Sequence, residues 1–70
     1  MFIYTKHALE KMDGLGLSRH EVEQAILQGM KWKETQSDKW HGQMSGIEVV
    51  FIPQEGNYFI ITTYLARREK

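Results

Sequence analysis

The chain has 70 residues, with nine Lys and Arg, nine Asp and Glu and no cysteine, so its formal net charge at pH 7 is zero. This length suits one small domain, and the lack of cysteine excludes disulfide bonds and thiolate metal sites. A neutral chain has no overall attraction to nucleic acid, so any RNA contact needs a local basic patch. No apolar run approaches the roughly 20 residues of a membrane helix. We therefore expect a single cytoplasmic domain over residues 1–70, without a membrane segment.

The N-terminal third begins with a brief apolar stretch and a first helix. Phe2–Tyr4 can form a short strand. The next segment, Lys6–Met12, has apolar residues at helical spacing, and Thr5 can cap its first turn. Gly14 and Gly16 are expected to end this helix, because glycine tolerates the positive φ of a helix stop.

A second helix is predicted over Arg19–Gln28. Ser18 and Glu21 have the spacing of a capping box, in which each side chain accepts a hydrogen bond from the backbone N–H of the other residue. Gly29 follows the last residue of the helical pattern and is the expected stop.

The remaining chain has the pattern of strands. Met30–Thr35 alternates between apolar and polar residues, and the polar segment Gln36–Gly46 is expected to be a loop or an irregular hairpin. Ile47–Ile52 is rich in β-branched residues and should end at Pro53, which cannot donate to a strand ladder. Tyr58–Leu65 is the strongest strand and should pair with the preceding one as a hairpin.

The predicted fold class is therefore α+β, with the two helices packed on one face of a three- to four-stranded antiparallel sheet. Simple alternation along the last strand would leave Tyr58, Ile60, Thr62 and Tyr64 on the open face of this sheet. The predicted core consists of apolar residues from the helices and the last two strands: Leu9, Met12, Leu17, Val22, Ile26, Val49, Phe51, Phe59 and Ile61.

The first candidate site is on the first helix. His7 and Lys11 are four residues apart and hence neighbours on its surface. A histidine titrates near neutral pH and can exchange protons, a lysine can stabilise developing negative charge, and Tyr64 could act as a proton donor. The alternative is a histidine at the border of the apolar face beside a solvated lysine.

The second candidate group is basic and aromatic. Lys39, Trp40 and His41 interleave the residue types that hold single-stranded nucleic acid, and Arg67 and Arg68 could grip phosphates. The alternatives are a tryptophan in the core and a charged tail that keeps the end of the sheet soluble. Of the two tryptophans, Trp32 is the stronger candidate for the core.

No cofactor or metal is expected. The three histidines lack metal-ligand spacing, and no glycine-rich loop with a phosphate-binding pattern precedes a helix.

The order of elements and the amino-acid sequences of the helices resemble the domain of unknown function numbered 4258. That family is similar in layout to the RelE-like and BrnT-like toxins, small ribonucleases of toxin–antitoxin pairs. The segments that carry the resemblance are Thr5-Lys6-His7-Ala8, Lys11-Met12, Gly16-Leu17-Ser18, Glu21-Val22, Ala25-Ile26, Gly29 and Ile60-Ile61-Thr62-Thr63-Tyr64.

The resemblance implies a metal-independent endoribonuclease. RNA would be its substrate, and an antitoxin or a second copy of the chain would cover the open sheet face. The residues above would divide into a catalytic group (His7, Lys11, Tyr64) and an RNA-binding group (Arg67, Arg68, Lys39, Trp40, His41). The alternative is a non-catalytic module of the same fold that binds protein or RNA, for which His7 would be dispensable.

Overall fold

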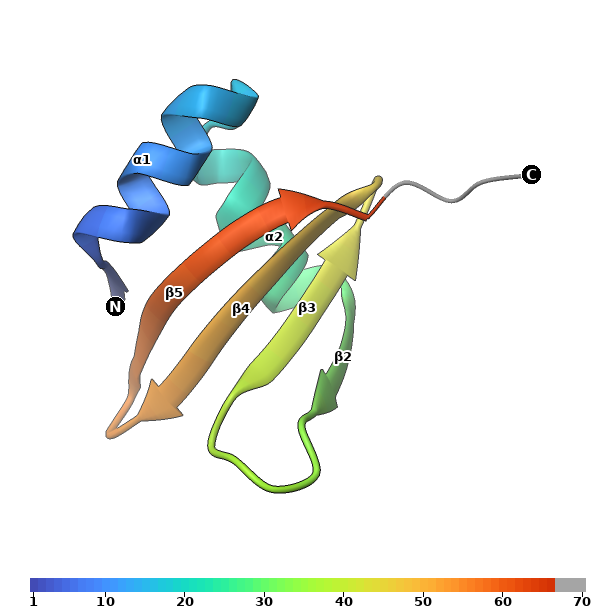
Figure 1. Ribbon diagram of the computed structural model, residues 1–70. Helices are drawn as coiled ribbons and strands as arrows, with labels where there is room; N and C mark the ends of the chain where they lie inside the picture. Colours follow the sequence, from blue (N-terminus) through green and yellow to red (C-terminus); the bar gives the residue numbers. More distant parts are fainter. Residues whose placement is uncertain (67–70) are drawn as a thin grey trace.

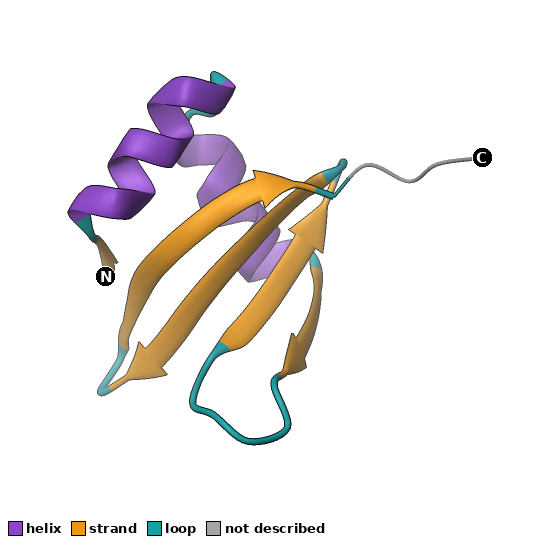
Figure 2. Ribbon diagram, viewed as in Figure 1, coloured by secondary structure: helices purple, strands orange, loops and turns teal. Residues whose placement is uncertain are grey.

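The structure is a computed structural model that describes residues 1–66, and these residues form two helices and one five-stranded sheet (Figures 1 and 2). Neither of these helices has the length and apolar character required to cross a membrane. In chain order the elements are β1 (Phe2–Tyr4), α1 (Lys6–Leu15), α2 (Arg19–Gln28), β2 (Met30–Lys33), β3 (Trp40–Met44), β4 (Ile47–Gln54) and β5 (Asn57–Leu65).

The sheet is larger than predicted and mixed rather than purely antiparallel. Its strand order is β1-β5-β4-β3-β2, with β1 parallel to β5 and the other neighbours antiparallel. The two helices carry the chain from β1 at one edge of the sheet to β2 at the other edge. The following strands return across the sheet, so β5 ends beside β1 and runs parallel to it. The additional strand β3 lies within Gln36–Gly46, the segment expected to be a loop or an irregular hairpin.

The start of α1 is fixed to β5 by Thr5. Its hydroxyl oxygen accepts a hydrogen bond from the Ala8 backbone N–H at 3.0 Å, as expected of a cap, and donates to the Ile60 carbonyl at 3.0 Å. The Thr5 backbone N–H donates to the same carbonyl at 3.2 Å. These contacts hold the start of α1 beside β5, just after the part of β5 that pairs with β1 (Figure 1).

The ends of the helices follow the local signals with one exception. Helix α1 continues through Gly14 and ends at Gly16, where φ is 73°. Glycine reaches this left-handed conformation without steric cost, which explains why the second of the two glycines is the stop. The capping box of α2 is present, with Glu21 N–H to Ser18 Oγ at 3.1 Å and Ser18 N–H to a Glu21 carboxylate oxygen at 2.8 Å, and α2 has the predicted bounds.

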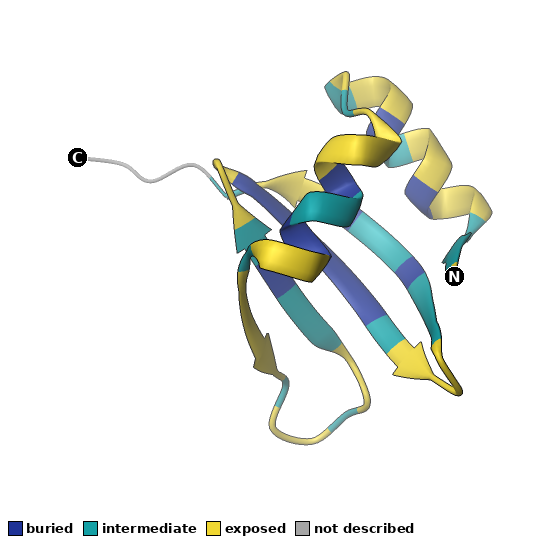
Figure 3. Ribbon diagram, turned by 180° about the vertical axis from the view of Figure 1, so that it is seen from behind, coloured by how far each residue is buried: buried dark blue, intermediate teal, exposed yellow. Residues whose placement is uncertain are grey.

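The core lies between the helices and one face of the sheet (Figure 3). The close fit of α2 on β3 depends on Gly42, since a Cβ there would lie 2.7 Å from the Ala25 carbonyl oxygen. The buried apolar residues of the core are Ala8, Met12, Val22, Ala25, Ile26, Ile47, Val49, Phe51 and Ile60.

A bulge in β5 changes which residues face the helices. Val50 of β4 pairs with Thr62, but Phe51 pairs with Ile60, so Ile61 is an extra residue in the ladder. A bulge of this kind interrupts the alternation of side chains along its strand. Residues before and after Ile61 therefore do not follow the single pattern that the sequence suggested.

Several predicted core and open-face positions are wrong, and those on β5 are wrong because of this bulge. Ile60 is fully buried, and Tyr58 packs against the core from the helix side rather than lying on the open face. Phe59 and Ile61 are only half-buried. Leu9 is 39% exposed, because the buried face of α1 follows Ala8 and Met12 instead.

Candidate functional site

The most densely connected polar side chains lie on the sheet face away from α2, which we call the open face. Gly42 of β3 lies against α2 and so marks the opposite, helix-covered face. Successive residues of a strand point to opposite faces, so the neighbouring His41 points to the open face. His41 pairs across the ladder with Trp32 of β2 and Val50 of β4, which share this face.

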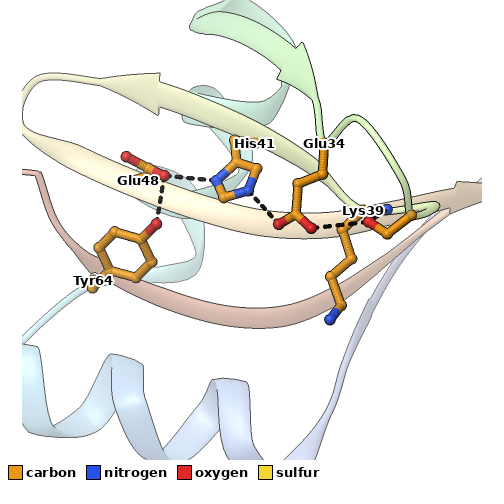
Figure 4. Close-up of polar contacts among 6 residues, drawn as sticks. Glu34, Lys39, His41, Glu48 and Tyr64 are labelled. Carbon is orange, nitrogen blue, oxygen red and sulfur yellow. Dashed lines mark hydrogen bonds and ion pairs between the residues drawn. The ribbon is translucent and has the colours of Figure 1, made fainter.

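Four side chains form a continuous hydrogen-bonded row on the open face, which we call the open-face network (Glu34, His41, Glu48 and Tyr64; Figure 4). The His41 Nδ1 atom lies 2.6 Å from Glu48 Oε2, and Nε2 lies 2.7 Å from Glu34 Oε2. The Tyr64 hydroxyl donates to Glu48 Oε2 at 2.5 Å. The network therefore connects β5, β4, β3 and the segment that follows β2.

The β2–β3 loop holds Glu34 in place. The Ser37 hydroxyl donates to Glu34 Oε1 at 2.9 Å and accepts from the Lys39 backbone N–H at 3.0 Å. The Glu34 backbone N–H donates to the Lys39 carbonyl at 2.9 Å. The serine in this loop thus sets the direction in which the Glu34 carboxylate points.

Exposed aromatic rings flank the His41–Glu48 pair at the centre of the network. The Trp32 ring stacks on the His41 ring, with centroids 5.2 Å apart and an interplanar angle of 9°. Trp32 is 39% exposed and Tyr64 is 37% exposed. The side chains of Glu48 and His41 between them are mostly covered, at 11% and 12% exposure. The open face therefore presents aromatic surfaces on either side of a polar centre.

The two carboxylates favour the charged form of His41. Burial by itself would lower the pKa of the imidazole, but hydrogen bonds and charge from Glu34 and Glu48 outweigh it and raise the pKa above its ordinary value of 6.5. The hydrogen bond from His41, followed by the one from Ser37, lowers the pKa of Glu34. Near neutral pH the two carboxylates thus favour an imidazolium at His41, the arrangement of a proton donor beside proton acceptors.

Tyr64 remains a neutral phenol over the same range. Burial, the hydrogen bond to Glu48 and the charge of that carboxylate raise the pKa of Tyr64 to about 12. As a phenol it can donate one hydrogen bond, which here goes to Glu48.

The structure separates the predicted catalytic residues into two neighbouring places. His7 is exposed on α1, and its Nε2 lies 3.0 Å from the Thr62 hydroxyl. Lys11, one turn later on the same helix, is half-buried. Tyr64 is two residues beyond Thr62 on β5 but bonds to Glu48. Within residues 1–66 no hydrogen bond or ion pair joins His7 or Lys11 to Tyr64.

The predicted RNA-binding residues are also divided. His41 is the centre of the open-face network, whereas Trp40, its neighbour in β3, points the other way and packs against the core. Trp40 rather than Trp32 is thus the tryptophan at the core. Lys39 is exposed beside Glu34, and its charge helps to lower the pKa of that carboxyl. Arg67 and Arg68 lie outside the described residues.

Sequence reasoning missed both glutamates of the network. Glu48 was the detectable one, because it is the only charged residue in the strongly apolar run Ile47–Ile52. A carboxylate that is 9% exposed in such a strand needs a polar partner. Glu34 carried no comparable signal, since its contact with His41 depends on the register of β2 on β3.

The side chains of the network do not converge on a point that a metal ion could occupy. The two carboxylates bind opposite nitrogens of the His41 ring and so lie on opposite sides of it. Within residues 1–66 no group of three or more His, Asp or Glu side chains has the arrangement of a metal site.

Comparison with known proteins places the chain in a family defined by sequence. The profile described as Domain of unknown function (DUF4258) matches residues 4–65, and the chain belongs to this family. The matched range includes the whole open-face network and both helices. No curated protein and no solved structure matched the chain.

Proposed function

We propose that the open face binds single-stranded RNA and cleaves it without a metal ion, as expected of a relative of the RelE-like and BrnT-like ribonucleases. The observation that carries this proposal is an imidazole ring held between two carboxylates that favour its charged form. It lies beside exposed aromatic rings, on a sheet face that the helices leave uncovered. Exposed aromatic side chains stack on unpaired bases in a way that tolerates any sequence. Trp32 would hold a base next to the proton-transferring groups.

The reaction would be an internal transesterification of the phosphodiester, in which the ribose 2′-oxygen replaces the 5′-oxygen on phosphorus. Glu34, whose side chain is 38% exposed, accepts the proton of the ribose 2′-hydroxyl while this oxygen attacks phosphorus. The bond from phosphorus to the 5′-oxygen breaks, and the His41 imidazolium gives its proton to the departing oxygen. The proton on Glu34 then returns to His41 through their 2.7 Å hydrogen bond. The exposed Lys39 would attract the phosphate.

The test is cleavage of an end-labelled single-stranded RNA in the presence of a metal chelator. The proposal predicts products that end in a 2′,3′-cyclic phosphate. It also predicts that a single 2′-deoxy nucleotide blocks cleavage at its own position, because the attacking hydroxyl is missing. Cleavage that continues at the 2′-deoxy position, or an intact RNA at every pH and salt concentration, would contradict the mechanism.

A second function, a binding module without turnover, is favoured by one specific observation. Both ring nitrogens of His41 already bond to carboxylates, so neither is free for a substrate unless one contact opens. In that case the same face would bind RNA or a protein and the network would only hold its shape. Tight binding of the labelled RNA without any cleavage would select this function.

The toxin–antitoxin setting is part of the proposal. An antitoxin or a second copy of the chain would cover the open face, where Trp32 and Tyr64 expose aromatic surface. Inducible expression in a bacterium should then slow growth and degrade RNA, and a variant with Glu34→Gln should do neither. Equal growth and intact RNA with both proteins would argue against a toxin.

A further inference from the structure

The outer strand β2 has the features of a docking edge for another strand. It is the last strand of the sheet, paired on one side with β3, and all four of its residues are exposed. Within residues 1–66 nothing pairs with its other side. Such an edge offers backbone groups that can add a strand from a partner.

The direction of the free backbone groups follows from the contact just after β2. The Glu34 N–H donates to the Lys39 carbonyl, so the backbone groups of Glu34 point towards β3. Backbone groups alternate in direction along an antiparallel strand. The N–H and C=O groups of Lys31 and Lys33 therefore point away from the sheet and are available to a partner strand.

The side chains of β2 give this edge two different sides. Trp32 lies on the open face over His41, and Met30, two residues earlier and 67% exposed, shares that face. Lys31 and Lys33 point to the opposite side, and neither forms an ion pair within residues 1–66. The Lys31 ammonium group donates to the carbonyls of Gly29 at 3.1 Å and Leu27 at 3.4 Å, at the end of α2. The edge is thus apolar on one side and positively charged on the other.

A second copy of this chain is a poor occupant of the edge. If two copies paired antiparallel through β2 with their open faces on the same side, the odd-numbered residues of one copy would lie opposite the odd-numbered residues of the other. Lys31 would then face Lys31 or Lys33 of the other copy, and like charges directly opposite are destabilising.

We infer that β2 accepts an extended peptide segment of a partner protein, with acidic residues at alternate positions and apolar residues between them. The acidic side chains would lie opposite Lys31 and Lys33, and the apolar ones beside Met30 and Trp32. The backbone of the segment would bond to the outward groups of the two lysines. This inference does not require RNA cleavage, because its hydrogen bonds use the outer edge of β2 and not the open-face network. Trp32 is the residue that it shares with the proposed RNA surface.

The test compares two synthetic peptides of about six residues, one alternating glutamate with valine and the other alternating lysine with valine. Backbone amide exchange of the full chain is followed by NMR. The glutamate peptide should slow exchange at Lys31 and Lys33 on the order of tenfold or more, and the lysine peptide should not. Met30 and Trp32, whose amides already point towards β3, serve as internal controls and should change little.

A charge-reversed protein provides the matched variant. With Lys31→Glu and Lys33→Glu together, protection should switch to the lysine peptide, and circular dichroism reports whether the fold is kept. Equal protection by both peptides would overturn the inference. So would protection by an RNA oligonucleotide alone, or a protein dimer whose own contacts protect Lys31 and Lys33.

Discussion

The two faces of the sheet are built from the same strands but make different kinds of contact. On the helix-covered face, Val49, Phe51 and Ile60 are at most 2% exposed and make apolar contacts. On the open face, Glu48, His41 and Tyr64 make hydrogen bonds to one another. Stability of the domain depends mainly on the first face, since burial of apolar area is the dominant favourable contribution to folding. Function is expected on the second.

This division gives a way to test each face separately. A substitution on the helix-covered face should reduce folding and, through folding, everything else. A substitution in the open-face network should reduce function while the fold is kept.

Two neighbouring isoleucines at the β5 bulge, the paired Ile60 and the extra residue Ile61, give the sharpest contrast in stability. Ile60→Ala should lower the free energy of unfolding by about 2–5 kcal/mol, because it opens a cavity in a fully buried site. Ile61→Ala removes the same atoms from a half-buried position and should cost clearly less. Urea denaturation of both variants measures the difference. An equal or larger loss for Ile61→Ala would show that the bulge is misplaced.

Three histidines allow the site of chemistry to be located. His41→Gln should reduce RNA cleavage by a factor of about 100 or more, the usual consequence of removing a general acid. His20→Gln is the control, because His20 lines a cleft with Gln24 and Met44 at the start of α2, away from the open face. Rates from a labelled RNA, with circular dichroism for folding, give the comparison.

The variant His7→Gln tests the earlier prediction from sequence. The open-face mechanism expects less than a tenfold loss, since His7 contacts Thr62 and not the network. A loss at His7 as large as at His41 would return the catalytic role to α1.

The pH dependence of stability should also reflect the network. The folded pKa of His41 is raised, so its contribution to stability is complete below its ordinary value of 6.5 and is lost as the pH rises through the folded value. The folded pKa of Glu34 is lowered, so its contribution is present above 4.5 and is lost as the pH falls through the folded value. Both contribute fully between these two values.

Urea denaturation at a series of pH values checks this window. The wild type should lose stability between weakly acidic and alkaline pH more than His41→Gln does, because the variant lacks the titrating group. Parallel pH profiles for the two proteins would mean that His41 is not held between the carboxylates in solution.

The smallest expected effect is on the ionisation of Tyr64. Its pKa should be about 12 in the wild type, and Glu48→Gln should bring it towards the ordinary value of 10, because the carboxylate charge is removed. The ultraviolet absorbance of tyrosinate reports this ionisation, and Tyr64→Phe identifies the contribution of this residue among the three tyrosines. An unchanged titration in Glu48→Gln would count against the contact.

The sequence predicted the elements with local signals and failed where contacts are distant. The capping box at Ser18 and the stop at Gly29 are short-range signals that define the two ends of α2. The predicted bounds of this helix are confirmed. β3 was missed because Gly42 and polar neighbours weaken its strand pattern, although Gly42 is required there by the approach of α2. The parallel pairing of β1 with β5 joins the two ends of the chain and has no local signature.

The candidate site was predictable only in fragments. His41 and Tyr64 were singled out for separate reasons, and their connection through Glu48 depends on the register of three strands. The β5 bulge had no signal in a run of β-forming residues, so Tyr58 and Ile60 were placed on the wrong face. The proximity of residues on different strands is set by pairing, which composition and periodicity do not encode.

The most direct test of the open face as the functional surface is NMR mapping with an RNA that cannot be cleaved. A short single-stranded oligonucleotide with 2′-O-methyl groups is titrated into the isotope-labelled protein. We expect shifts at the Trp32 indole N–H, at the His41 ring and along β3 and β5 near Tyr64, with none at His20. Shifts confined to the exposed side of α1 around His7, or no shifts at saturating RNA, would contradict the assignment of function to this face.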